Sequence, residues 1–152
     1  MDIILFDGDC ILCNRSVRFI LKRDPKAVFH FASLQSSVGK TLLTRLNIPD
    51  FKGRTIIYIE NGHYTSRSTA VLKILRKTDS IWKYTYAFIF IPRFLRDAVY
   101  TFISSIRYEL FGKAITCRIL PQHFQERFLN QENLPEEILP AENSSGETRV
   151  YD

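Results

Sequence analysis

The feature that most constrains this chain is a Cys-x-x-Cys pair at the junction of a predicted strand and a predicted helix. Residues 3–6 form an unbroken apolar run, which is typical of a strand buried on both faces. The turn sequence Asp7-Gly8-Asp9 follows, and from Cys10 onward apolar residues mix with polar and basic ones at helical spacing. That spacing predicts a helix of about three turns, ended by Asp24-Pro25 because the residue before a proline resists the α region. Cys10 and Cys13 are therefore expected at the start of the first helix.

Two cysteines in this position have the geometry and the electrostatics of a redox pair. Residues three apart on a helix have Cβ atoms about 5–6 Å apart, close enough for a disulfide after a small adjustment. Free amide groups and the helix dipole stabilise a thiolate, and cysteine pKa values in such motifs fall to roughly 3.5–7.5. We expect Cys10, nearest the exposed tip, to attack a disulfide and Cys13 to resolve the mixed disulfide. Asp7 and Asp9 oppose the thiolate but can exchange a proton with Cys13, which makes both candidate catalytic residues.

The rest of the pattern predicts an α/β fold with a mixed sheet. Further strands are expected at 27–32, 55–60 and 63–66, and further helices at 40–46 and 68–77. A strand–helix–strand succession predicts parallel strands, whereas Asn61-Gly62 predicts an antiparallel hairpin. Ser68 is expected to cap the helix that follows this hairpin. The succession β-α-β-α-β-β-α is thioredoxin-like, with a four-stranded mixed sheet flanked by helices.

An aromatic-rich segment, 81–111, follows the predicted sheet and is interrupted by Pro92. The spacing of apolar residues after Pro92 predicts a C-terminal helical extension that packs onto the redox domain. No charge-free stretch approaches the roughly 20 residues of a spanning helix, but contact of 81–111 with a membrane surface stays open. Residues 129–152 hold six acids and one arginine, so this segment carries −5 and residues 1–128 carry +10. We expect one domain over 1–128, with its extension over about 81–128, and a disordered acidic tail over 129–152.

Composition narrows the setting and the partners. Three cysteines are too few for a disulfide scaffold, and the N-terminus shows no basic and apolar leader, so a reducing, cytoplasmic setting is expected. The basic residues are scattered rather than clustered, which indicates a solvated surface and no specific nucleic-acid site. We expect no cofactor and no metal. The expected partner is a protein that carries a thiol or a disulfide, or a glutathione-like thiol.

Two other kinds of site fit parts of the motif. The cysteines could be structural thiols of a binding or scaffold domain, or half of a zinc site. Such a zinc site would draw its other ligands from residues that form no second paired motif: Cys117, His30, His63 and His123. Asp7-Gly8-Asp9 after a strand also matches the D-x-D of haloacid-dehalogenase-like phosphatases, in which the first aspartate attacks phosphorus beside magnesium. Such an enzyme needs a downstream acidic pair, and this chain has none before Glu136-Glu137.

The stretch Asp7-Gly8-Asp9-Cys10-Ile11-Leu12-Cys13 resembles the D-G-x-C-x-x-C signature of the DCC family, a thioredoxin-like group described as thiol-disulfide oxidoreductases. The likeness covers about residues 2–121 and includes 62–75, 91–92, 96–100, 107–108 and 111–112. It implies a redox-active Cys10/Cys13 pair. Cys117 matches a cysteine often found in the family and is a candidate third thiol.

Further candidate residues lie in the extension and near the third strand. Four charged or phenolic residues either assist the site or form a salt bridge that pins the extension: Arg96, Asp97, Tyr100 and Arg107. Thioredoxins place a cis-proline just before the third strand to bind substrate. Here that place falls near Arg54-Thr55, and Pro49 comes several residues earlier. We assign substrate binding on this side to Thr55 and Ser68.

Overall fold

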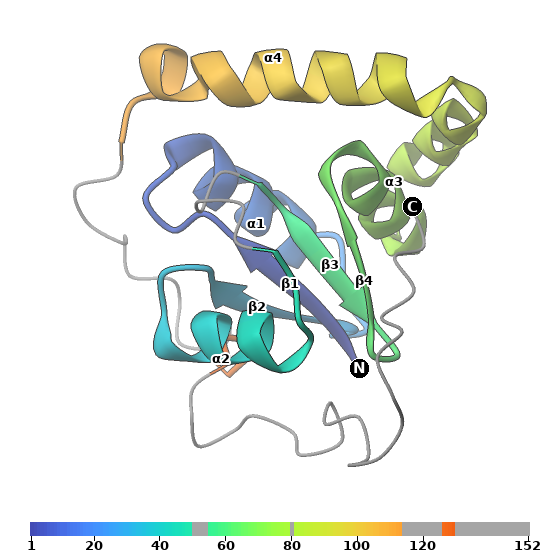
Figure 1. Cartoon of the computed structure of the whole chain (residues 1–152). Helices are drawn as coiled ribbons and strands as arrows, with labels where there is room; N and C mark the ends of the chain where they lie inside the picture. The colour runs from blue at the N-terminus through green and yellow to red at the C-terminus, as the bar shows by residue number, and fades with distance from the viewer. Residues whose placement is uncertain (50–54, 80, 114–125, 130–152) are drawn as a thin grey trace.

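The computed structural model describes residues 1–49, 55–79, 81–113 and 126–129 (Figure 1). The strands are β1 (Asp2–Phe6), β2 (Phe29–Ser33), β3 (Ile57–Glu60) and β4 (His63–Ser66). The helices are α1 (Ile11–Leu21), α2 (Ser37–Arg45), α3 (Arg67–Lys77), the 3-10 helix η1 (Ile81–Phe90) and α4 (Arg93–Phe111).

The four strands form one mixed sheet in the order β2-β1-β3-β4. β1 pairs in parallel with β2, with Phe6 opposite Ser33, and antiparallel with β3, with Leu5 opposite Ile57. β3 and β4 form the antiparallel hairpin that Asn61-Gly62 predicts, and both of these turn residues have positive φ. The expected thioredoxin-like α/β fold is therefore confirmed. The register also brings the ends of β1 and β2 and the start of β3 together at one end of the sheet.

Helices cover both faces of the sheet because β1 is apolar on both sides. Ile3 and Leu5 belong to a core formed with α2, and Ile4 and Phe6 belong to a second core formed with α1 and α3. All four of these side chains are buried. This arrangement explains the unbroken apolar run in the sequence, since a strand covered on both faces has no polar side.

α4 lies across the edge of the sheet at which β1 ends, above α1 and α3 (Figure 1). The extension therefore does pack onto the redox domain, as its aromatic pattern predicts. A short segment after the extension pairs with β2, which is an edge strand of the sheet. Phe31 N–H donates to the Arg127 carbonyl at 2.9 Å, and Leu129 N–H donates to the Phe31 carbonyl at 2.8 Å. The acidic tail predicted for 129–152 lies, apart from Leu129, outside the described residues. The predicted domain boundary thus stays a prediction.

Three helix boundaries differ from the sequence prediction. α1 ends at Leu21, before Asp24-Pro25, because Asp24 instead accepts hydrogen bonds from the N–H groups of Val28 and Phe29 at 3.1 and 2.9 Å. α2 begins at Ser37, three residues before the predicted start, because the Ser36 side chain caps it.

The third difference concerns α3, which begins at Arg67 with Ser66 at its N-cap position. The prediction that Ser68 caps this helix is wrong. The Ser68 hydroxyl instead donates to the Asp97 carboxylate of α4 at 2.5 Å. A partner from a distant helix has replaced the local backbone partner that the sequence pattern suggested.

None of the helices that the structure describes is both long enough and apolar enough to cross a membrane.

The close approach of α2 to the end of β2 gives a stability prediction. A Cβ atom added to Gly39 would lie 2.1 Å from the backbone oxygen of Ser33. The sheet and helix would have to separate, so Gly39→Ala should lower the free energy of unfolding by about 1–3 kcal/mol in urea denaturation. Ser37→Ala, two residues earlier on an exposed position, is the matched control and should change it by less than about 0.5 kcal/mol. A Gly39→Ala protein as stable as the control would contradict the described contact.

Candidate redox site

The two cysteines lie where α1 begins, and the first caps the helix that carries the second. Cys10 is the N-cap residue of α1, and its Sγ accepts a hydrogen bond from the Cys13 N–H at 3.3 Å. Both cysteines are free thiols, Cys10 buried and Cys13 partly exposed. A sulfur in the N-cap position receives an amide donor that the helix cannot satisfy itself, so the fold supplies a thiolate with a built-in partner.

The surroundings shift the pKa values of the two thiols in opposite directions. Hydrogen bonding from the Cys13 thiol lowers the pKa of Cys10 to about 6, against the effect of burial, and the charge of Arg107 adds to the lowering. The same hydrogen bond with Cys10, together with burial, raises the pKa of Cys13. The Asp7 carboxylate acts against the Cys10 thiolate, as the sequence predicts. At neutral pH the pair therefore holds a thiolate on Cys10 and a proton on Cys13.

Cys10 does not face solvent, so the prediction of an exposed tip is wrong. Its exposed fraction is 0%, and Lys113 pairs with it in an antiparallel β-bridge. Lys113 comes two residues after the end of α4, so the extension returns over the motif. A covering segment from a hundred residues away leaves no trace in the local pattern around the cysteines.

A buried ion pair lies beside the thiols and ties α4 to the turn after β1. Arg107 Nη2 lies 2.7 Å from Asp7 Oδ2, and the side chains of the two residues are only 4% and 1% exposed. The Tyr108 hydroxyl donates to the same carboxylate oxygen. The other oxygen accepts from Gln35 Nε2 at 2.8 Å and from the Asp9 N–H at 3.1 Å. The Asp7 carboxylate thus has donors on both oxygens.

The remaining candidates of the extension contact two different elements. Tyr100 contacts the residues just before β3, and Arg96 and Asp97, one turn earlier in α4, contact Ser68 of α3. The Tyr100 hydroxyl accepts from the Ile56 N–H at 3.0 Å and lies 3.3 Å from the Thr55 hydroxyl. Burial raises the pKa of Tyr100, so its hydroxyl keeps its proton. Thr55, which we assigned to substrate binding, is therefore in contact with α4 in this structure.

Ser68, the other residue assigned to substrate binding, also contacts α4. It donates to Asp97 and accepts from Arg96 Nη1 at 3.4 Å, while Asp97 forms an ion pair with Arg93 at 3.5 Å. The extension is thus pinned at several points, and only the Arg107 pair is next to the thiols. Asp9 is exposed and reaches the site through its backbone N–H, and Cys117 lies outside the described residues.

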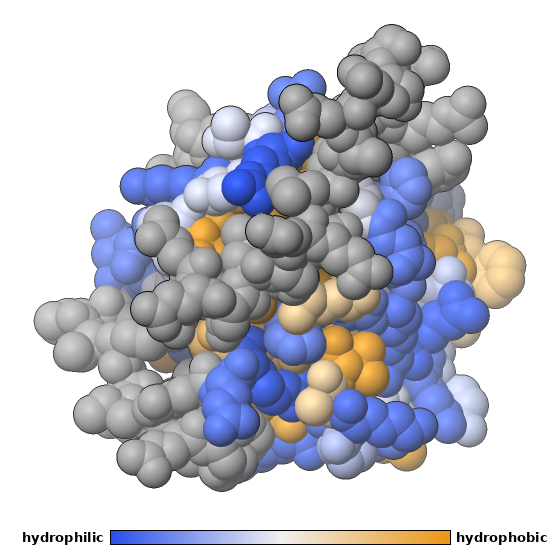
Figure 2. Space-filling model, turned by 90° about the horizontal axis from the view of Figure 1, so that it is seen from below, coloured by the Kyte–Doolittle hydropathy of each residue, from blue (hydrophilic) through white to orange (hydrophobic). Residues whose placement is uncertain are grey.

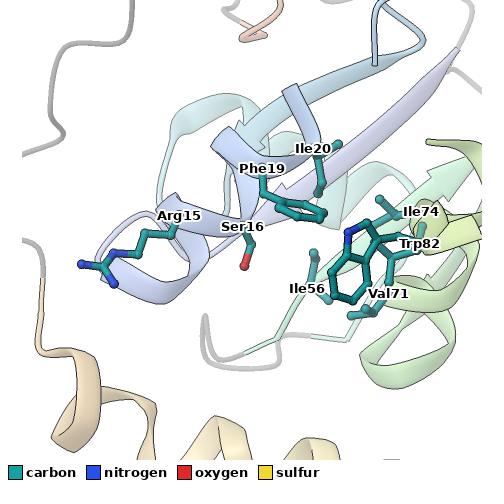
Figure 3. Close-up of a pocket in the computed structure, with 9 residues that line it drawn as sticks. Arg15, Ser16, Phe19, Ile20, Ile56, Val71, Ile74 and Trp82 are labelled. Carbon is teal, nitrogen blue, oxygen red and sulfur yellow. The ribbon is translucent and has the colours of Figure 1, made fainter. Parts of the chain in front are cut away.

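An apolar pocket opens beside the site, between α1, α3 and η1 (Figure 3). It has a volume of about 410 Å³ and is lined chiefly by Phe19, Ile20, Ile56, Val71, Ile74 and Trp82. The Phe19 and Trp82 rings meet edge to face with centroids 5.6 Å apart. A smaller cavity of about 190 Å³ shares Ile20, Ile56 and Val71 with this pocket and is lined by Cys13. Apolar space therefore extends from the surface to the second thiol.

The structure also bears on the metal and phosphatase alternatives. The described residues contain no group of three or more His, Cys, Asp or Glu side chains placed so that it could hold a metal ion. His30 is opposite Ile3 and His63 is opposite Glu60, so the register puts both away from the end of β1 that leads to the cysteines. Asp7 is buried against Arg107 and Tyr108, which leaves no open carboxylate to attack a phosphate.

Three residues of the site were not singled out in the sequence: Gln35, Tyr108 and Lys113. Gln35 follows β2 as Asp7 follows β1, and the ends of parallel strands meet at one edge, so the predicted topology contained a signal for it. Tyr108 was quoted only as part of the family resemblance. Nothing in the sequence pairs Lys113 with Cys10.

Arg107 and Asp7 act in opposite directions on the pKa of Cys10, so removing each charge should shift this pKa in the opposite direction. In a Cys117→Ser background, ultraviolet absorbance of the thiolate should titrate with a midpoint near pH 6. Arg107→Gln removes the favourable charge and should raise this midpoint by about one pH unit. Asp7→Asn removes the unfavourable charge and should lower it by roughly half a unit.

Arg127→Gln is the matched control, because Arg127 pairs with the buried Asp24 at the far edge of the sheet. It should leave the Cys10 midpoint unchanged. Circular dichroism establishes that each variant is folded. Equal shifts for Arg107→Gln and Arg127→Gln would show that general destabilisation, and not local charge, sets the midpoint.

Comparison with known proteins agrees with the motif. The model of the family described as DCC1-like thiol-disulfide oxidoreductase matches residues 4–113. The chain is 39% identical over 127 residues to an uncharacterized Bacillus subtilis protein, YuxK. The aligned region covers 84% of this chain and 93% of YuxK. It is 36% identical over 118 residues to a chloroplastic DCC family protein of Arabidopsis thaliana. This aligned region covers 77% of this chain and 69% of the Arabidopsis protein. No solved structure matches it significantly. The chain therefore belongs to the DCC1-like thiol-disulfide oxidoreductase family.

Proposed function

We propose that this protein exchanges a Cys10/Cys13 dithiol–disulfide pair with a partner that carries a thiol or a disulfide, either a protein or a low-molecular-weight thiol. The observation that carries this proposal is the Cys10 sulfur at the start of α1, which accepts a hydrogen bond from the Cys13 N–H with the Cys13 thiol beside it. It lowers the pKa of Cys10 to about 6 and raises that of Cys13. One thiolate and one protonated thiol at neutral pH is the state that exchange requires.

In the reductive direction, the Cys10 thiolate attacks one sulfur of the partner disulfide. A Cys10–partner disulfide forms, and the other partner sulfur leaves as a thiolate. Cys13 then gives its proton to the partner thiolate released in the first step and attacks the Cys10 sulfur, which closes the Cys10–Cys13 disulfide and releases the second partner thiolate. The partner gains two electrons and the cysteine pair loses two. The oxidative direction is the reverse.

Asp7 and Arg107 act on this chemistry through charge and position. Arg107 favours the Cys10 thiolate, and Asp7 holds Arg107 in place at 2.7 Å. Because donors already occupy both oxygens of Asp7, we assign it as a positioning residue and not as the group that takes the Cys13 proton. Asp9 supports Asp7 through its backbone N–H.

Access decides which partners can react. Cys10 is fully buried and its backbone pairs with Lys113, so a partner sulfur reaches it only after a local movement of the residues around it. The cavity lined by Cys13 then offers apolar contact to the group next to the partner sulfur. This favours partners with an apolar side chain beside the reacting cysteine.

Trapping the mixed disulfide tests the proposal. In a Cys117→Ser background, Cys13→Ser removes the resolving thiol, so oxidised glutathione or a disulfide-containing peptide should leave a stable adduct on Cys10, detected by mass spectrometry. The rate of adduct formation should follow the Cys10 thiolate and be half-maximal near pH 6. It should exceed the rate for free cysteine at pH 6 by at least tenfold, because free cysteine is almost wholly protonated there.

Cys10→Ser is the paired variant and should form no comparable adduct through Cys13, since the pKa of Cys13 is raised in the wild-type protein. A binding or scaffold domain with inert thiols predicts the opposite result. In that case neither single variant reacts faster than free cysteine. That result would rule out the exchange reaction proposed here.

A further inference from the structure

α4 carries its polar side inward and its apolar side outward. The hydrogen bonds of α4 to the redox domain come from polar residues: Asp97, Tyr100, Arg107 and Tyr108. An amphipathic helix on a globular protein ordinarily turns its apolar stripe to the core. Here the apolar side that carries Phe94, Phe102 and Leu110 faces solvent. Figure 1 shows no described element on this outer side of α4.

The exposed fractions establish how far this inversion goes. Phe94 is 77% exposed, Phe102 66% and Leu110 67%. Leu95 and Val99 lie on the same side of the helix and are about half exposed, whereas Ile103 lines the cavity that contains Cys13. An α-helix rises about 1.5 Å per residue, so the stripe from Phe94 to Leu110 is roughly 24 Å long. This is far more than the scattered apolar residues of an ordinary surface.

η1 continues this surface toward the N-terminus. It has no buried residue, and Phe90 and Tyr84 are 90% and 72% exposed. Among the residues that the structure describes, every exposed large apolar side chain except Met1 belongs to 81–111. On the opposite side of the molecule, seen from below in Figure 2, described hydrophilic residues lie around apolar areas. We call the exposed apolar surface that the described residues of η1 and α4 form the outer face.

Charge selects what covers the outer face. Residues 81–113 contain five basic and two acidic residues. Arg107 is buried against Asp7, Arg93 pairs with the inward-turned Asp97, and Arg96 donates to Ser68. The exposed charges are therefore Lys83 and Lys113, near the two ends of the segment, and Glu109. A second copy of the chain would bring two segments of net positive charge together. An anionic bilayer instead offers apolar depth together with charge of the opposite sign.

We propose that the outer face of η1 and α4 binds in the plane of an anionic phospholipid bilayer. Aromatic side chains such as Phe90 and Phe94 enter the boundary between headgroups and acyl chains, and Lys83 and Lys113 contact the headgroups. The inward side of α4 keeps its bonds to Asp7 and Ile56, so the redox site stays assembled above the membrane. This binding is independent of the exchange reaction proposed above.

Trp82, the only tryptophan of the chain, packs on Phe19 but stays 43% exposed in η1, so its emission reports on lipid contact of this helix. The wild-type protein is mixed with vesicles of phosphatidylcholine alone or of phosphatidylcholine with an equal part of phosphatidylglycerol. With the anionic vesicles, Trp82 emission should shift to the blue and the protein should co-sediment. Binding to the neutral vesicles should be at least about tenfold weaker, since the lysines lose their partners.

Variants on the outer face separate membrane binding from self-association. Phe94→Ser/Phe102→Ser should weaken binding to anionic vesicles at least tenfold. The matched variant Phe94→Leu/Phe102→Leu keeps the positions apolar and should bind within about threefold of wild type. Both double variants should retain the Cys10 thiolate titration, because neither residue contacts the site.

Light scattering supplies the alternative outcome. A wild-type dimer that Phe94→Ser/Phe102→Ser dissociates, with no binding to either vesicle, would assign the outer face to a second copy of the chain and overturn the proposal. Equal binding of the two double variants to anionic vesicles would also overturn it, because the apolar side chains would then have no role.

Discussion

The buried ion pair between Asp7 and Arg107 is the interaction on which the site depends. It joins the turn after β1 to the last part of α4, a hundred residues along the chain. Two charges removed from water are stabilising only if further hydrogen bonds satisfy them, and here Tyr108, Gln35 and the Asp9 N–H do so. Loss of one member would leave the other charge buried and alone, at a cost of roughly 3–5 kcal/mol. The extension is thus part of the redox domain and not an appendage.

The same pair places one charge of each sign next to Cys10, and this explains why the thiol is only moderately acidified. Arg107 favours the thiolate and Asp7 opposes it, so the largest effect is left to the hydrogen bond from the Cys13 thiol. A second hydrogen bond, from the Cys13 N–H, adds to it and depends on α1 beginning at Ile11, because this start turns that N–H toward the Cys10 sulfur. Helix geometry sets the reactivity of the pair, and the distant ion pair adjusts it.

Local pattern predicted the strands, the hairpin and the Cys-x-x-Cys junction, because each depends on neighbouring residues. The covering of Cys10 could not be predicted in this way, since Lys113 and Arg107 reach the motif from the far end of α4. Ser68 shows the same limit, as its hydroxyl has a local backbone partner in the sequence pattern and a distant one, Asp97, in the fold. Arg107 was identified as a candidate, but only the fold shows that its partner is Asp7.

The two sides of α4 have one explanation. A helix that must hold a buried carboxylate with Arg107 and a backbone amide with Tyr100 has to turn polar residues toward the sheet. Its apolar residues, Phe94 and Phe102 among them, then have no place except the outside. Such an arrangement is unfavourable in water, because each Å² of apolar surface left exposed forgoes roughly 25 cal/mol of the free energy that burial would give. The cost is removed if a bilayer covers that surface. The redox site and the proposed membrane contact would therefore use opposite sides of a single helix.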